Sequence, residues 1–316
     1  MNRQKTFDTP ILFLVFNRPE TTSIVFEQIK KIKPSKLFIA ADGPRDYLSE
    51  EIIRCNKVKQ IVSQIDWPCE IKTLFREKNL GCKLAVSIAI TWFFDQVDYG
   101  IVLEDDCLPD LTFFTFCEEL LIEYKNDSDI MLIGGNNFHK NKLDIASSYY
   151  FSNYSHIWGW ASWRRAWKTY SLDISDYSTV LNQDCNTDFF QSKNEKKYWL
   201  QVLGNVAQGN INTWDYQWTY AIWKNKGKSI TPSVNMIKNI GLDENSTHLF
   251  VKDSFRDNLQ LFKMKFPLIH PASDINKKLD NQTYKNVYSK SLSRAFRLFK
   301  ENSVVSLYSY FLKKIK

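Results

Sequence analysis

The chain has 316 residues, of which 44% are hydrophobic and 24% are charged, a composition that fits one large globular domain or two modest ones. Ten of its 42 Lys and Arg residues but only two of its 35 Asp and Glu residues fall in residues 277–316, so this tail carries a net +8 and residues 1–276 a net −1. A neutral body argues against nucleic-acid binding there, and the basic tail favours an anionic partner.

The cysteines and the N-terminal residues indicate a cellular compartment. Six cysteines without a C-x-x-C pair predict reduced thiols in a reducing environment. The first ten residues lack the apolar core of a signal peptide, and no apolar run has the length of a membrane span. We therefore expect a cytoplasmic protein, peripheral on the inner face of the cytoplasmic membrane if the basic tail binds lipid.

Short apolar runs alternate with segments of helical length along the first half. The runs predict buried strands at residues 11–16, 36–41, 70–75, 100–105 and 130–135. The spacing between them predicts helices from residue 19 to 32 and over residues 49–65, 81–94 and 111–124. Strand and helix in alternation predict a mostly parallel sheet with helices on both faces.

Polar clusters containing Gly or Pro follow each predicted strand. They lie at residues 17–20, 42–46, 76–82, 104–110 and 134–139. Ligands of such sheets bind beyond the carboxyl ends of the strands, so we expect the five clusters to meet in one crevice. Three consecutive acids, Glu104 to Asp106, are the strongest feature among them.

Beyond residue 150 the sequence becomes rich in tryptophan, notably in residues 155–170 and 213–230. No linker or internal repeat separates this part from the first half. We expect an acceptor-binding part that is continuous with the sheet.

Four segments together resemble one enzyme family: "ILFLVFNRPETT", "KLFIAADGPR", "EKNLGCKLAV" and "GIVLEDDCLP". In this order and spacing they resemble the nucleotide-sugar-dependent glycosyltransferases of the GT-A fold. The match is closest to bacterial sugar transferases related to the N-acetylglucosaminyltransferase I family. It covers about residues 10–135 and extends plausibly to about 250.

The resemblance implies an α/β, Rossmann-like GT-A fold. It would have a mostly parallel central sheet flanked by helices, a helical and aromatic acceptor side, and a basic helical tail. Residues 1–250 would be the catalytic domain, with 1–135 as its nucleotide-sugar-binding half and 136–250 as its acceptor-binding half. Residues 251–316 would be a C-terminal extension.

The resemblance also assigns the acids to a divalent metal. Glu104-Asp105-Asp106 fills the place of the D-x-D-like motif that holds Mn²⁺ or Mg²⁺ against the donor diphosphate, ions that suit hard carboxylate oxygens. Asp106 would be the metal ligand, with Asp105 and Glu104 in supporting roles. His248 would join from a loop at 241–248, unless it is structural or exposed. The plainer alternative for the acids is a solvated strand end.

Other residues acquire donor-binding roles by the same resemblance. Phe16, Asn17 and Arg18 would border the base and ribose, and Asp42 and Gly43 would lie against the base. The remaining ones would lie near the base or diphosphate: Arg76, Asn79, Gly81 and Lys83. Each could instead be a turn former or a surface ion pair.

For catalysis, Asp215 is the preferred general base of an inverting transfer, and Asp184 and Asp188 are weaker options. The alternative for Asp215 is that it caps the helix that starts at the next residue. On the acceptor side, Trp158, Trp160 and Trp163 could offer flat faces to a sugar, or could be buried core residues.

The tail has the pattern of a basic amphipathic helix. Apolar residues at helical spacing, Leu292, Ala295, Phe296 and Phe299, lie among Lys and Arg. Such a helix suits an anionic membrane surface, or it packs on the domain with its basic face in solvent.

The expected function is a metal-dependent, inverting transfer of a sugar from a nucleotide donor, with a UDP-sugar favoured, to a hydroxyl of an acceptor. The acceptor would be a glycan or a lipid-linked molecule in bacterial surface polysaccharide synthesis. Two alternatives stand behind it. A sugar nucleotidyltransferase usually has a Gly-rich loop after the first strand, and "VFNRPETT" has no glycine. A non-catalytic carbohydrate-binding protein would not need the three acids.

Overall fold

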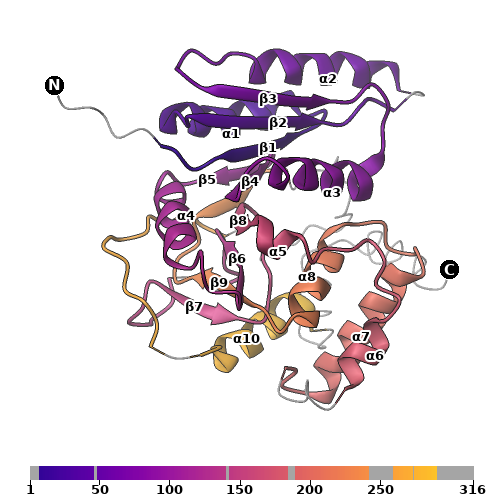
Figure 1. The fold of residues 1–316 in the computed structure, drawn as a ribbon, viewed down its shortest axis with the longest axis vertical. Helices are drawn as coiled ribbons and strands as arrows, with labels where there is room; N and C mark the ends of the chain where they lie inside the picture. Colours follow the sequence, from indigo (N-terminus) through magenta and orange to yellow (C-terminus); the bar gives the residue numbers. More distant parts are fainter. Residues whose placement is uncertain are drawn as a thin grey trace, which may run out of the picture.

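Eight strands form one mixed sheet at the centre of the molecule (Figure 1). The computed structural model describes residues 7–45, 48–139, 142–183, 189–241, 259–272 and 274–289. The strands run in the order β3-β2-β1-β4-β8-β6-β9-β7, and a separate antiparallel pair joins β5 to β10. Their bounds are β1 Ile11–Val15, β2 Lys36–Ala41, β3 Glu70–Phe75, β4 Tyr99–Glu104, β5 Cys107–Pro109, β6 Ile130–Gly134, β7 Tyr149–Ser152, β8 Trp160–Trp163, β9 Lys228–Pro232 and β10 Ile237–Asn239.

Helices cover both faces of this sheet. Their bounds are α1 Pro19–Ile32, α2 Ser49–Val62, α3 Gly81–Phe94, α4 Thr112–Glu123, α5 Arg164–Trp167, α6 Tyr177–Asn182, α7 Lys193–Ala207, α8 Asp215–Lys224 and α10 Lys277–Thr283, followed by a π-helical turn at Tyr284–Tyr288. The α/β class expected from the sequence is confirmed.

The side-chain alternation of β1 explains its uninterrupted apolar sequence. Ile11 and Phe13 belong to a core shared with α1, α2 and α4, whereas Leu12 and Leu14 belong to a core shared with α3, α7 and α8. Because both faces are covered, neither set of positions tolerates polar residues. Each fully buried Ile, Leu or Phe stabilises the fold by about 1.5–3 kcal/mol.

The predicted elements of the first half are confirmed to within a few residues. β1, β2, β4 and β6 match four of the predicted buried strands, and α3 has the predicted bounds. β3 matches its predicted range, but its predicted burial is wrong, because it is an edge strand whose residues are exposed or half-buried. β1 to β4 are joined by parallel pairings, as expected. The later strands β7 to β10 were not predicted from the sequence.

The Trp-rich segment supplies one of these unpredicted strands, β8. It lies between β4 and β6 and pairs antiparallel with both. It therefore separates the carboxyl end of β6 from that of β4. The cluster at residues 134–139 does not join the crevice formed by the other four: Asn136 and Asn137 are fully buried.

Residues 259–272 and 274–289 pack on the same body, in part at the β7 edge of the sheet. Tyr149 of β7 shares a hydrogen bond of 2.7 Å with His270, and Asp280 of α10 accepts hydrogen bonds from Ser152 and the Asn153 N–H. The expected amphipathic tail lies outside the described residues. Among the helices that the structure describes, none is long and apolar enough to cross a bilayer.

The Asp280 carboxyl predicts a pH-dependent stability. Burial raises its pKa from 3.8 to about 7, although Ser152 and Asn153 oppose this rise. Because the pKa of this carboxyl is higher in the folded than in the unfolded chain, its ionisation lowers the stability of the folded protein as pH rises from about 4 to about 7. The cost is on the order of 4 kcal/mol once Asp280 is ionised.

We expect Asp280→Asn to flatten this dependence, because the amide cannot ionise. The melting temperature of the wild type should fall between about pH 4 and pH 7 relative to that of the variant. Asp66→Asn, a change at an exposed acid in the loop after α2, is the control. Parallel curves for wild type and Asp280→Asn would contradict the prediction.

Candidate active site

A cavity of about 660 Å³ opens at the carboxyl ends of β1, β2 and β4. Twelve of the residues predicted from the sequence line it: Phe16, Asn17, Arg18, Asp42, Arg76, Asn79, Gly81, Glu104, Asp105, Asp106, Trp158 and Asp215. Gly43 and Lys83 do not line it. His248, Asp184 and Asp188 lie outside the described residues.

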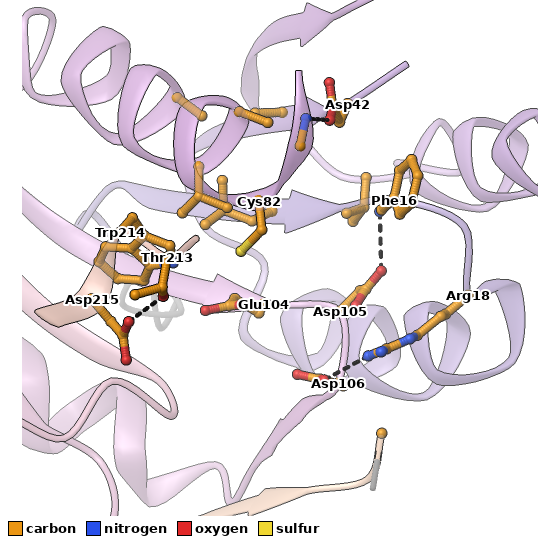
Figure 2. A pocket seen from close by; sticks show the side chains of 18 of the residues that line it. Phe16, Arg18, Asp42, Cys82, Glu104, Asp105, Asp106, Thr213, Trp214 and Asp215 are labelled. Atoms are coloured by element: carbon orange, nitrogen blue, oxygen red, sulfur yellow. Dashed lines mark hydrogen bonds and ion pairs between the residues drawn. The ribbon is translucent and has the colours of Figure 1, made fainter. Parts of the chain in front are cut away.

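The three acids lie in the middle of the cavity (Figure 2). Asp105 is 7% exposed and accepts a hydrogen bond of 3.0 Å from the Phe16 N–H. Burial and the charge of Asp106 raise its pKa to about 7, and Arg18 opposes this rise. Burial, Asp106 and Asp105 also raise the pKa of Glu104 well above its usual value. The carboxyl end of β4 is therefore a place where negative charge needs a partner.

Asp106 has such a partner in Arg18. The Arg18 Nη1 atom lies 2.7 Å from Asp106 Oδ2, and the two side chains are 22% and 16% exposed. This ion pair fixes the residues that follow β1 to the end of β4, two strands that already pair in parallel. Arg18 therefore contacts the acidic motif, whereas its predicted place was beside the base and ribose.

Asp42 joins the loop after β2 to the start of α3. Its carboxylate accepts hydrogen bonds of 3.0–3.1 Å from the N–H groups of Gly43, Leu80 and Gly81. A helix N-terminus offers such free N–H groups, and its dipole favours the negative charge. Most of the acceptor capacity of Asp42 is therefore used within the protein, and its contact with a base stays a prediction.

Gly43 and Gly81 both belong to this junction. A Cβ atom at Gly43 would lie 2.5–2.6 Å from the backbone of residues 77–78, so a side chain would push the two loops apart. Gly81 has a φ of +76°, a conformation that favours glycine. Asn79 completes the junction with a hydrogen bond of 2.8 Å to the Gly43 carbonyl.

Arg45 is a cavity residue that the sequence did not single out. Its guanidinium lies 5.9 Å from the centre of the Phe16 ring. Glu51, which is 4% exposed, accepts hydrogen bonds from the Arg45 backbone N–H at 2.7 Å, from the Arg45 guanidinium and from the Asn17 amide at 2.6 Å. Glu51 looked like an ordinary helix-surface acid in the sequence, so only its position in space shows that it holds two cavity residues.

Asp215 is the first residue of α8 and lies on the side of the three acids opposite Arg18 (Figure 2). The Thr213 hydroxyl donates a hydrogen bond to its Oδ1 atom. The helix is preceded by Trp214 and has no side-chain cap, so Asp215 does not cap it as the alternative proposed. Trp214 and Tyr216 line the cavity beside it.

Cys82 also faces this cavity from the first turn of α3. Although Cys82 is exposed overall, desolvation of its thiol, followed by the charges of Glu104 and Asp215, raises the pKa of the thiol to about 12. The thiol therefore remains protonated near neutral pH and does not suit a nucleophile.

The prediction that Trp160 and Trp163 offer flat faces to a sugar is wrong. Both side chains are buried, with exposed fractions of 0% and 2%. Trp160 stacks on Trp214 with ring centres 6.0 Å apart, and Trp163 donates a hydrogen bond to the Leu121 carbonyl. They are core residues because β8 is an inner strand of the sheet, whereas Trp158 lies just before it and lines the cavity.

The side chains that line the cavity could supply only some of the ligands that a divalent cation needs. Within the described ranges, no three His, Cys, Asp or Glu residues are grouped so that they could hold a metal ion. Mg²⁺ is commonly held by one or two carboxylates together with substrate phosphates and water. Asp106 therefore fits a cation that is shared with a bound diphosphate, and the residues do not fit a cage made by protein alone.

Glu51 lies outside the cavity, yet its hydrogen bonds predict that its removal lowers both the stability of the protein and its affinity for a ligand. Glu51→Ala should lower the free energy of unfolding by about 1–3 kcal/mol, because Arg45 and Asn17 lose their acceptor. Burial raises the pKa of Glu51, but the hydrogen bonds from Arg45 and Asn17 bring it below its usual value. The stabilisation should therefore be lost as pH falls through that lowered pKa.

Denaturant unfolding and UDP titration check this expectation. Glu50→Ala removes an exposed acid from the same helical turn and is the matched control. Equal stability of the Glu50→Ala and Glu51→Ala proteins would contradict it.

Comparison with known proteins gives distant likenesses only. No family model and no curated protein sequence matches the chain. Among solved structures, HddC from Yersinia pseudotuberculosis is similar over 50% of this chain and 77% of its own, with 13% identity and a TM-score of 0.31.

Two further solved structures are similar to the chain at a comparably low sequence identity and TM-score. The 4-diphosphocytidyl-2C-methyl-D-erythritol synthase from Anaerococcus prevotii is similar over 62% of this chain and 84% of its own, with 8% identity and a TM-score of 0.31. Mouse xyloside xylosyltransferase 1 in its apo form is similar over 69% and 82%, with 10% identity and a TM-score of 0.35. Likenesses this distant do not assign the chain to a family or an activity.

Proposed function

We propose that the protein is a glycosyltransferase that moves a sugar from a nucleoside diphosphate donor, preferably a UDP-sugar, to a hydroxyl of a glycan or lipid-linked acceptor. One observation carries the proposal. A single cavity joins an arginine-lined part, three acids at a strand end, and a separate carboxylate, Asp215, in a tryptophan-lined part. Such a transfer needs a site for each of the donor, the leaving diphosphate and the acceptor.

The arginine-lined part suits the nucleotide. Arg45, Arg76 and Arg18 bring positive charge to the cavity, and Phe16 offers an aromatic ring. Guanidinium groups bind phosphate oxygens with paired hydrogen bonds. Glu51 holds Arg45 in place before a ligand arrives, and Asp105 holds the Phe16 backbone.

The acids suit the leaving group and its cation. Mn²⁺ or Mg²⁺, when bound between Asp106 and the diphosphate, would neutralise the charge that develops on the departing nucleoside diphosphate. Asp105 holds the Phe16 backbone, and Glu104 lies between Asp105 and Asp215 in the view of Figure 2.

Asp215 suits the general base. In an inverting transfer the acceptor oxygen attacks the anomeric carbon while the bond from that carbon to the diphosphate oxygen breaks. The hydroxyl proton passes to a base on the acceptor side. Thr213 occupies Oδ1 of Asp215, which leaves Oδ2 to receive the proton.

The cellular role proposed is bacterial surface polysaccharide or glycoconjugate synthesis at the inner face of the membrane. Its support is the sequence resemblance and the basic composition of the tail. Lipid-linked acceptors lie at that surface, so a basic tail would bring the cavity to them.

The test is release of UDP from a panel of UDP-sugars with Mn²⁺, with and without candidate acceptors. Asp106→Ala should lower the rate by about 100-fold or more, because the cation loses its carboxylate. Asp215→Asn should lower kcat by about 100- to 10,000-fold while UDP affinity stays unchanged.

Asp95→Asn, an exposed acid at the end of α3, is the control and should behave as the wild type. The proposal would be abandoned if the wild type neither bound nor turned over any nucleotide sugar. Binding without turnover would favour the non-catalytic carbohydrate-binding alternative.

A further inference from the structure

The ion pair between Arg18 and Asp106 occupies the carboxylate that a divalent cation would need. Arg18 Nη1 lies 2.7 Å from Asp106 Oδ2, within strong hydrogen-bond distance. The other oxygen, Oδ1, accepts a contact of 3.4 Å from the Cys107 thiol. Both oxygens of Asp106 therefore have protein partners.

The surrounding backbone is shaped to fit this pair. β10 pairs with β5, and the Ile240 N–H donates a hydrogen bond of 2.8 Å to the Asp106 carbonyl. This brings Gly241 against the pair. A Cβ atom there would lie 2.6 Å from Asp106 Oδ2 and 2.7 Å from Arg18 Nη1. The pair fits because residue 241 has no side chain.

A guanidinium in this position opposes a metal ion in two ways. It competes for the same oxygen, and its charge repels a second cation at short range. A diphosphate removes both obstacles, because its oxygens are a better partner for the planar guanidinium than one carboxylate oxygen is. Arg18 lines the cavity, so its head can reach a ligand there.

We propose that Arg18 is the resident counter-cation of Asp106 and couples metal binding to nucleotide binding. Without nucleotide, Arg18 neutralises Asp106 and keeps divalent cations out. When a nucleoside diphosphate enters, Arg18 turns to the phosphates and Asp106 becomes free for the metal. Binding of metal and nucleotide is then mutually favourable, as linkage requires. The inference rests on the proposed function for the nature of the ligand.

The experiment measures Mn²⁺ binding directly, by the electron paramagnetic resonance signal of free Mn²⁺, with and without saturating UDP. In the wild type, UDP should raise Mn²⁺ affinity by about tenfold or more. In Arg18→Gln, Mn²⁺ should bind without nucleotide about tenfold more tightly than it binds to the wild type, and UDP should change its affinity less.

Arg76→Gln is the matched control, since it removes one positive charge from the same cavity and leaves the Asp106 pair intact. Asp106→Asn should abolish the gain when combined with Arg18→Gln. Arg18→Lys, which keeps the charge but not the planar head, should lie between wild type and Arg18→Gln, and it serves if Arg18→Gln does not fold.

Two results would overturn the proposal. One is an unchanged nucleotide-free Mn²⁺ affinity in Arg18→Gln, or in Arg18→Lys if that variant is the one measured. The other is an equal gain in Arg76→Gln, which would show a general charge effect. If no variant binds UDP while Arg18→Gln still gains Mn²⁺ affinity, the glycosyltransferase proposal fails but the counter-cation role of Arg18 stands.

Discussion

The constraint on which the site depends is the crowding of three consecutive carboxyl groups, one buried and two half-buried, at the end of β4. Negative charge removed from water has to be neutralised, protonated or hydrogen-bonded. The protein uses all three means: Arg18 pairs with Asp106, the Phe16 N–H binds Asp105, and Glu104 has a raised pKa. Two of these partners come from the segment after β1, so compensation of the acids also fixes one wall of the cavity.

The same kind of interaction organises the remainder of the arginine-lined part. Asp42 binds the N–H groups at the start of α3, and Glu51 binds Arg45 and Asn17. In both cases a carboxylate from one βα unit holds a loop or side chain that is distant in sequence. The cavity is therefore ordered before a ligand enters, which lowers the conformational entropy lost on binding. An anionic ligand then meets Arg45 already in place.

The sequence predicts well the elements whose pattern is set by two-sided burial. β1, β2 and β4 are continuous apolar runs because both faces are covered, and the polar clusters after them do meet. The sequence predicts poorly the features that depend on the order of the strands in the sheet. Nothing in residues 160–163 shows that they form an inner strand, so Trp160 and Trp163 could not be distinguished from exposed tryptophans. The same strand explains why the cluster at 134–139 lies apart. Arg45 and Glu51 gain their importance from a contact between a loop and α2, which no local pattern reveals.

The many tryptophans then have a different purpose from the one expected of them. Trp160 lies within 6.0–6.1 Å of Trp214 and Trp218, and Trp167 lies 5.0 Å from Trp218, measured between ring centres. Trp214 and Trp218 flank Asp215 in sequence and belong to the start of α8. Large rings in contact define the position of a helix closely, because few arrangements fill the same volume. The aromatic cluster therefore connects the inner strand β8 to the helix that presents Asp215. Trp160, Trp167 and Trp218 thus act on the position of a carboxylate, whereas Trp158 and Trp214 line the cavity that a ligand would enter.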